Sequence, residues 1–265
     1  MGMIGVAALV LVLVLASSAI GFVLQSALRE KHRSRETLDA VWLVMSILVT
    51  FTALVLGLLT STVKSSHDLF EARLRGFASD IIQLDQGLRE YGESTDPIRE
   101  NLRTYVAAAI ADTWRDEPLP TGAYPTFPPA PDAEERQPLG ALLVGVASAI
   151  RRLEPADTFH RKLADSLAAT TSDTLAQRWM LLVTAPDTIS QPLIILLTAW
   201  LAVIFGAFGL ISPRNVVVYL TIIMCALSIS SAVYLILEMD KPLEGFIRVS
   251  SAPFRDALRH IDAPR

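Results

Sequence analysis

Histidine and cysteine, the residue types that most often bind metals or act as nucleophiles, are few and scattered in this chain. The histidines are His32, His67, His160 and His260, and the single cysteine is Cys225. His67 and Glu71 have the i, i+4 spacing that places two side chains on one helix face. Two ligands do not complete a metal site, so we expect a surface ion pair and predict no metal and no cofactor.

Sequence motifs of catalysis are also missing. The chain has no phosphate-binding glycine loop, no nucleophile elbow and no metalloprotease motif. Cys225 lies inside an apolar run, where burial in a core would raise its pKa and leave the thiol unreactive. A lone cysteine also excludes a disulfide within the chain. We therefore predict that the protein is not an enzyme.

The group with the clearest local chemistry is the turn after the last apolar run, where we name Asp240, Pro242, Gly245 and Arg248 as candidate site residues. Pro242 cannot continue a helix, and Gly245 permits a backbone turn. Arg248 can return to pair with Asp240 or Glu244. The turn is then either a hinge or charged ring at a pore mouth, or a structural turn that docks the C-terminal segment. Its composition favours the second interpretation, because such residues are common in turns.

The elements that position these groups are four apolar runs. None of the four contains a charged residue or a histidine. They are Met3–Leu24, Val41–Ser61, Pro192–Ile211 and Val216–Leu237. Each has about the 20 residues that a helix needs to cross the hydrocarbon core. One central charged residue would cost about 2.5–3.5 kcal/mol on insertion scales. The sequence therefore predicts an all-α integral membrane protein with four spans.

The same absence of buried charge restricts the function. Ionisable residues inside spans mark proton relays and voltage sensors, so a pump or proton-coupled transporter is disfavoured. A passive pore remains, because hydrophobic constrictions and helix ends can gate ions. Ala202 with Gly206, and Ala226 with Ser230, have small-xxx-small spacing. This spacing predicts close packing within the four-helix set, with self-association as the alternative.

The charges around the spans bear on orientation. The first run lacks a positive n-region and stays apolar through Leu24, so we expect it to remain as a span despite the small residues at Ala16–Ala19. The basic loop 29–35 predicts a cytoplasmic first turn, with the N-terminus, the inserted domain and the C-terminus extracytoplasmic. Basic residues also flank the spans on the other side: Lys64, Arg73, Arg75, Lys241, Arg248 and Arg255.

An inserted domain at 62–191 separates a first transmembrane hairpin (1–61) from a second (192–237), and a C-terminal tail (238–265) follows. Apolar residues recur in steps of four and three at Phe70, Leu74, Phe77, Ile81, Leu84, Leu88 and Tyr91. This spacing predicts that the second span continues as one amphipathic helix. The helix either packs in the bundle of the inserted domain, which is the ordinary case, or forms a stalk or oligomer seam.

The rest of the inserted domain also has a helical pattern. One helix should begin with a cap at Asp96 and Pro97 and end near Trp114. The Pro-rich segment 118–138 cannot sustain a helix, and we expect an extended or mobile loop. Two further helices are predicted at Leu139–Leu153 and from a cap at Asp157 to Leu182. Together the helices predict an antiparallel bundle between spans two and three.

Several of these features occur together in one known family. The two-plus-two spans, the basic first loop, the inserted domain with Tyr105 followed by Trp114, and the tail 239–250 resemble the bacterial bestrophin-like domain family, whose function is unknown. The resemblance covers essentially the whole chain. Its most specific part is the tail, where the family pattern is Asp, any residue, Pro, Phe, any residue, Gly, and then Arg-Val-Ser. Leu243 replaces the usual Phe and keeps that position apolar.

The resemblance implies an oligomeric, passive anion channel, because the family is named for a distant likeness to bestrophins, which are pentameric anion channels. It transfers no pore residue, since no bestrophin gate motif matches here. The alternative is a membrane-anchored scaffold or sensor with an extracytoplasmic helical domain. We expect the partners to be the lipid bilayer and further copies of the chain. Nucleic acid is excluded by a net charge of -4 and by the lack of basic runs interleaved with aromatic residues.

Overall fold

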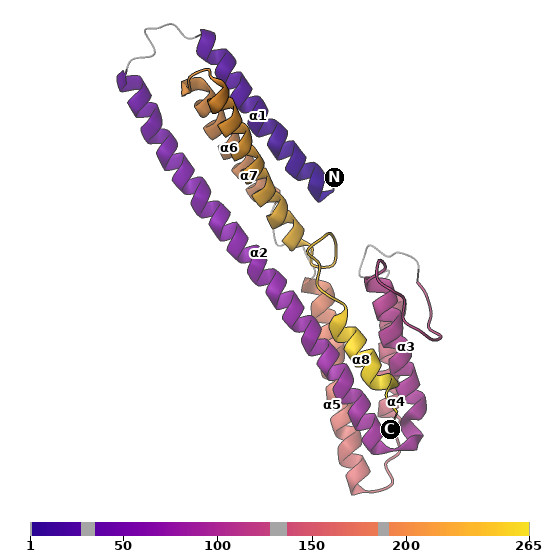
Figure 1. Ribbon diagram of the computed structural model, residues 1–265. Helices are drawn as coiled ribbons and strands as arrows, with labels where there is room; N and C mark the ends of the chain where they lie inside the picture. The colour runs from indigo at the N-terminus through magenta and orange to yellow at the C-terminus, as the bar shows by residue number, and fades with distance from the viewer. Residues whose placement is uncertain (1, 28–34, 128–136, 185–190, 265) are drawn as a thin grey trace. The chain divides into compact units, whose positions relative to one another are not determined.

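The computed structural model describes residues 2–27, 35–127, 137–184 and 191–264, and the regular elements within these ranges are all helices (Figure 1). The helices are α1 (Met3–Ala27), α2 (Arg35–Tyr91), the short 3₁₀ helix η2 (Glu93–Thr95), α3 (Asp96–Thr113), α4 (Gln137–Arg151), α5 (Thr158–Thr184), α6 (Gln191–Ile211), α7 (Val216–Asp240) and α8 (Ala252–Asp262). The all-α prediction is confirmed.

The chain forms two compact units. Met1–His67 and Asp187–Ile247 form the first, which we call the membrane unit. Asp68–Pro186 and Arg248–Arg265 form the second, which we call the helical unit. Residues of α2 up to His67 belong to the membrane unit, and its later residues belong to the helical unit.

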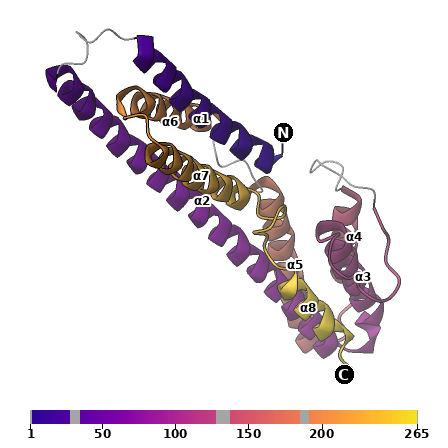
Figure 2. The ribbon, with the colours of Figure 1, turned by 45° about the horizontal axis from the view of Figure 1, so that its top comes forward.

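The membrane unit contains α1, the first part of α2, α6 and α7, which run side by side in both views (Figures 1 and 2). All four helices are long and apolar enough to cross a membrane, as predicted. One buried cluster joins them, with Val14 from α1, Met45 from α2, Leu201 from α6 and Val233 from α7 among its members. Side chains outside this cluster are mostly large, apolar and exposed, as hydrocarbon contact requires.

Helices α1 and α6 approach each other through small residues. A Cβ added to Gly209 would overlap the Ser18 carbonyl oxygen, and one added to Gly21 would overlap the Gly206 carbonyl oxygen. The Ser17 hydroxyl donates to the Ala202 carbonyl. Such backbone proximity is the usual use of small residues in membrane helices. The predicted Ala202 and Gly206 pair therefore serves packing within the four-helix set.

In the helical unit, the second part of α2 packs with α3, α5 and α8, and α4 packs with α3 and α5. Every residue of the predicted four-and-three stripe from Phe70 to Tyr91 is buried. Helix α2 is a single helix of 57 residues, so the second span does continue beyond the apolar run. The stripe is the core face of a bundle, which is the ordinary interpretation of such a pattern.

The structure confirms one of the two predicted helix caps and corrects the other. Asp157 caps α5, because its carboxylate accepts a hydrogen bond from the His160 amide at 2.8 Å. That hydrogen bond also lowers the pKa of Asp157. Asp96 is the first residue of α3 instead of its cap, and Thr95 stands before it. The Thr95 hydroxyl donates to the Gly92 carbonyl at 2.7 Å and fixes the turn between α2 and α3.

Two predicted segments lie wholly or partly outside the described residues. They are the basic loop, of which 29–34 are outside, and the Pro-rich loop, of which 128–136 are outside. Helix α4 begins at Gln137, so the Pro-rich loop ends slightly earlier than expected. The orientation and the mobility assigned to these loops remain predictions.

The C-terminal tail contains a helix that the sequence analysis did not anticipate. Helix α8 follows Ser251 and has a proline in its first turn. Its buried face is Phe254, Ala257, Leu258 and Ile261, a helical spacing that could have indicated it. The Phe254 ring lies 5.4 Å from Phe77 and 5.7 Å from Trp114 between centroids. The buried face of α8 therefore belongs to the core of the helical unit.

A carboxylate between α2 and α5 makes the stability of the helical unit depend on pH. Partial burial raises the pKa of Asp80 above 3.8, and the nearby charge of Asp173 raises it further. The Gln177 amide opposes this by donating to Asp80 at 2.6 Å. A carboxyl with a raised folded-state pKa favours folding when protonated, and this contribution is lost as the pH rises through the folded pKa.

We therefore expect Asp80→Asn to raise the melting temperature at pH 7 and to have no effect near pH 3, where Asp80 is protonated in both states. Thermal unfolding of the purified protein at the two pH values checks this. Asp165→Asn is the matched control, because Asp165 is exposed on α5 and should leave both values unchanged. A lower melting temperature for Asp80→Asn at pH 7 would contradict the assignment.

Candidate functional site

The predicted turn after the last span is built around a buried carboxylate. Asp240 is the last residue of α7, Pro242 is buried, and Gly245 has φ 79°. Glu238 is only 1% exposed and accepts a hydrogen bond from the Phe246 amide. A Cβ on Gly245 would overlap this carboxylate, so Gly245 serves both the conformation and the close approach. The sequence analysis missed Glu238 because it lies one residue beyond the apolar run.

Arg248 has a partner that the sequence did not indicate. Its guanidinium donates to the Asp116 carboxylate at 2.9 Å instead of pairing with Asp240 or Glu244. The neighbouring Val249 carbonyl accepts from the Trp114 indole at 2.9 Å. Arg248 therefore secures the segment before α8 within the helical unit.

The start of α8 is held by the residues that follow Trp114. The Ser251 hydroxyl donates to the Glu117 carboxylate. Arg255 pairs with Glu117 at 3.1 Å and donates to the Pro118 carbonyl at 2.8 Å. These contacts fix the first part of the Pro-rich segment against α8. They also give the Arg-Val-Ser part of the tail a structural role.

The two aromatic residues noted in the inserted domain are both buried. Trp114 holds the tail as described above, and Tyr105 is 2% exposed. Burial raises the pKa of Tyr105 to about 12, although a hydrogen bond with Arg178 opposes the shift. Arg178 is itself 7% exposed and lies against Gly140 of α4, where a Cβ would be 2.9 Å from the guanidinium. This buried polar contact connects α3, α4 and α5.

The end of α8 meets a cluster of arginines from α2 and α3, which we call the arginine cluster (Arg89, Arg99 and Arg103). Arg89 donates to the carbonyls of His260 and Ala263 at 2.7 and 2.9 Å. The last carbonyls of a helix lack partners within the helix and carry partial negative charge. An arginine side chain can donate hydrogen bonds to these carbonyls, and its positive charge is attracted to their partial negative charge.

Behind these arginines lies a carboxylate with no exposed surface. Asp85 accepts from the Nε atoms of Arg89 and Arg99 at 2.6 and 2.7 Å. Arg99 also donates to the Ile261 carbonyl at 3.2 Å. Asp85 and Arg89 stand between the apolar positions of the four-and-three stripe, on faces that would meet solvent on an isolated helix. The structure buries them because α8 covers that face of α2.

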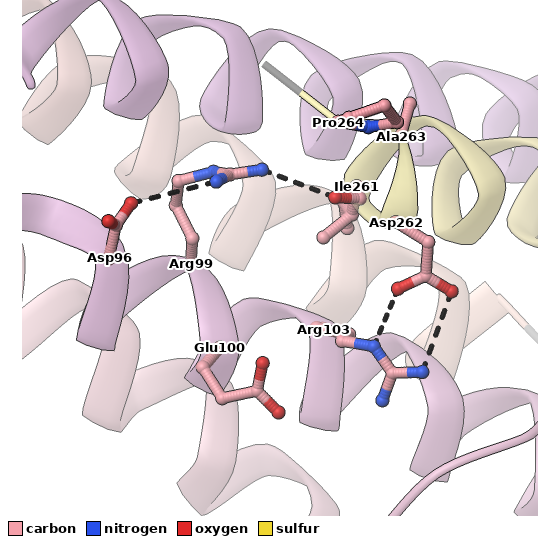
Figure 3. A pocket seen from close by; sticks show the side chains of 8 residues that line it. All are labelled: Asp96, Arg99, Glu100, Arg103, Ile261, Asp262, Ala263 and Pro264. Atoms are coloured by element: carbon pink, nitrogen blue, oxygen red, sulfur yellow. Dashed lines mark hydrogen bonds and ion pairs between the residues drawn. The ribbon is translucent and has the colours of Figure 1, made fainter. Parts of the chain in front are cut away.

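An open pocket of about 430 Å³ lies beside the arginine cluster (Figure 3). Arg103 forms an ion pair with Asp262 at 2.6 Å on one side, and Arg99 lies 3.7 Å from Asp96 on the other. Most of the charged groups that line the pocket therefore neutralise one another. Across the described ranges, no three His, Cys, Asp or Glu side chains are grouped to hold a metal ion. The pocket is a junction between α3 and α8.

A different kind of surface lies on α2 inside the membrane unit. Small or polar residues recur there in steps of four and three, all of them exposed, and we call them the polar stripe: Ser46, Thr50, Ala53, Gly57, Thr60 and Lys64. The hydroxyls of Ser46, Thr50 and Thr60 each donate to the carbonyl four residues earlier at 2.8 Å. Their donors are satisfied within the helix, while their oxygens remain able to accept.

The polar stripe is one of three faces of α2. Met45, Leu59 and Val63 form the face buried in the membrane unit. Phe51 and Leu58 lie on a second face of exposed, large apolar residues suited to lipid. Hydroxyl and small side chains in a span more often face another helix or a water-filled path. The sequence analysis missed the stripe because it searched the spans for ionisable residues only.

Comparison with known proteins agrees with this architecture. The model of the bestrophin-like domain matches residues 12–254. The chain belongs to the bestrophin-like family. A solved structure of a mutated bacterial bestrophin homologue from Klebsiella pneumoniae is similar in fold, with a TM-score of 0.62 and 17% identity over 98% of this chain and 97% of that one. No curated protein matches the chain.

Family membership confirms the resemblance stated from the sequence and makes this bestrophin-like chain a multi-pass membrane protein. The prediction that Cys225 is buried in a core is wrong, because this residue is exposed on α7. The sequence placed Cys225 in a span but could not show which face of that span is covered.

Proposed function

We propose that this bestrophin-like protein is a homo-oligomeric, passive anion channel whose conduction path is lined by the polar stripe of α2. The observation that carries the proposal is the third face of α2, the polar stripe. This face is not buried in the core of the membrane unit, and it lacks the large apolar side chains that suit contact with lipid. Copies of the chain arranged around an axis could each contribute this face to a shared path. Hydroxyl oxygens and small side chains along it would leave room for a hydrated ion.

A passive mechanism fits the charge distribution. The part of α2 that carries the stripe has charged residues only near its ends, with Asp39 at one end and Lys64 at the other. Ion movement would then follow the electrochemical gradient, because none of the four apolar runs contains an Asp, Glu, Lys, Arg or His that could couple it to protons. The preference for anions rests on the likeness to bestrophins and not on the stripe itself.

The turn and the orientation complete the proposal. Asp240, Pro242 and Gly245 would form a structural turn at the end of α7, and Arg248 would anchor the following segment through Asp116. The basic loop at 29–35 supports a cytoplasmic first turn, with both termini and the helical unit extracytoplasmic.

Thiol modification in liposomes tests the path. In a Cys225→Ala background, a water-soluble thiol reagent is expected to reduce chloride flux strongly when Thr50 is replaced with cysteine. Phe51→Cys is the matched control, because Phe51 lies about 100° around α2 from Thr50, on the lipid-suited face of the same helix, and should be insensitive. Equal sensitivity at both positions would reject the assigned path. A monomer with no flux would instead favour the alternative, a membrane-anchored scaffold or sensor.

A further inference from the structure

The turn that follows α7 presents an exposed aromatic residue. Phe246 is 87% exposed, more than any other large apolar side chain in the described part of the chain. Its neighbour Ile247 is 36% exposed, so two adjacent apolar side chains stand at the tip of the turn. A single exposed apolar residue is ordinary on a protein surface. The position of this pair relative to the span is what distinguishes it.

The turn folds back to the end of the span. The Phe246 amide donates to the Glu238 carboxylate, and a Cβ on Gly245 would overlap the same carboxylate. Glu238 directly follows Leu237, the last residue of the fourth apolar run. Side chains of a helix tilt toward its N-terminus, so the Glu238 carboxylate lies level with the final turn of that run. The backbone of Phe246 therefore lies close to the depth at which the apolar run ends.

A second aromatic residue supports this depth. The Tyr234 side chain, one turn before Glu238 on α7, forms a hydrogen bond with the same carboxylate. Aromatic residues with an apolar ring and a polar end are enriched at the headgroup level, where they form belts at both membrane surfaces. Glu238 thus holds Tyr234 and the backbone of Phe246 at one level, where the membrane changes from apolar to polar.

The turn has a defined conformation and no excess of positive charge. Gly245 has φ 79°, Pro242 is buried, and the Glu244 amide donates to the Lys241 carbonyl at 3.1 Å. A preorganised turn loses little conformational entropy when its tip binds. Lys241 and Glu244 also form an ion pair at 3.5 Å and neutralise each other. The tip therefore fits the boundary below the headgroups better than a particular anionic headgroup.

We propose that the turn 241–247 inserts Phe246 and Ile247 into the boundary between the lipid headgroups and the acyl chains. This contact fixes the end of α7 at the membrane surface, and its partner is the lipid surface itself. It goes beyond the proposed conduction path, because an anchor of this kind requires neither ion flux nor a second copy of the chain.

Spin labels measure the depth of the turn. In the Cys225→Ala background, Phe246→Cys is labelled with a nitroxide in phosphatidylcholine liposomes, and its accessibility to oxygen is compared with that to a water-soluble nickel complex. Met224→Cys provides the hydrocarbon reference, because Met224 is 68% exposed near the middle of α7. Leu119→Cys is the matched water control, because Leu119 is 64% exposed in the helical unit and outside the apolar runs.

We expect the ratio of oxygen to nickel accessibility at position 246 to be severalfold higher than at position 119 and lower than at position 224. A ratio equal to either reference would overturn the proposal. Low accessibility to both reagents would also overturn it, because Phe246 would then lie against protein, such as a second copy of the chain.

Photolabelling of the wild-type protein makes the test independent of the cysteine variants. Two phosphatidylcholines are compared, one with a diazirine near the headgroup and one with a diazirine at the end of an acyl chain. We expect the shallow probe to label the peptide that contains Phe246 severalfold more than the deep probe does, and the deep probe to label the middle of α7 around Met224. Equal labelling of the Phe246 peptide by the two probes, or no labelling of it, would reject the anchor.

Discussion

Asp85→Ala is expected to destabilise the helical unit by about 3–5 kcal/mol, the range measured when one partner of a buried ion pair is removed. Asp85 has no exposed surface and accepts from both Arg89 and Arg99, whose side chains are only 18% and 14% exposed. Its removal leaves the largely buried Arg89 without a carboxylate and leaves Arg99 with only the more distant Asp96, 3.7 Å away. The carbonyls at the end of α8 cannot replace that charge, because they already accept from the same arginines.

Thermal unfolding in detergent, followed by tryptophan fluorescence, measures the effect. Trp114 is buried against α8 and should report loosening of the C-terminal segment. Trypsin should also cleave at Arg255 and Arg259 earlier in the variant than in the wild type. Both readouts distinguish local release of α8 from a general loss of protein.

The chain contains a matched control for this prediction. Glu71 and Arg75 form the same kind of i, i+4 ion pair on α2, but the arginine side chain is 64% exposed and the glutamate 35%. Exposed pairs contribute about 0–1 kcal/mol, so Glu71→Ala should barely change the melting temperature. Equal shifts for Asp85→Ala and Glu71→Ala would show that the buried pair contributes no more than the exposed one.

The elements that could be predicted from sequence are those determined by local pattern. The four spans follow from uninterrupted apolar runs, because a charge inside hydrocarbon is costly and few alternatives exist. The continuation of α2 follows from the spacing of Phe70 to Tyr91, since only a helix brings those residues onto one face. Asp157 was recognisable as a cap because capping depends on residues within one turn.

The features that were missed depend on contacts between distant segments. Asp85 stands between apolar positions of a heptad and would be exposed on an isolated helix, but α8 arrives from the end of the chain and covers it. Arg248 has two acidic residues nearby in sequence, yet it pairs with Asp116, which lies 132 positions away. Local proximity therefore suggested the wrong partner. The polar stripe was visible in the spacing, but its meaning depends on which faces of α2 are covered.

The close approach of α1 and α6 should be the least tolerant contact of the membrane unit, and Gly209→Leu is expected to abolish it. A Cβ at Gly209 meets the backbone oxygen of Ser18, which cannot rotate away as a side chain can. The helices must separate, so we expect a cost at or above the upper end of the about 1–3 kcal/mol typical of overpacking. Leucine is a better helix former than glycine, so reduced helix propensity cannot explain a loss.

The yield of folded protein after size-exclusion chromatography, together with its melting temperature, measures this effect. Gly57→Leu is the control, because a Cβ at Gly57 has no neighbour within 4 Å in the chain. Gly57→Leu should be recovered as folded protein, whereas Gly209→Leu should be recovered mainly as aggregate. Because Gly57 lies on the polar stripe, Gly57→Leu should nevertheless block chloride flux if that face lines the path. Normal folding of Gly209→Leu would mean that α1 and α6 do not meet through these residues. Normal chloride flux through Gly57→Leu would mean that the polar stripe does not line the conduction path.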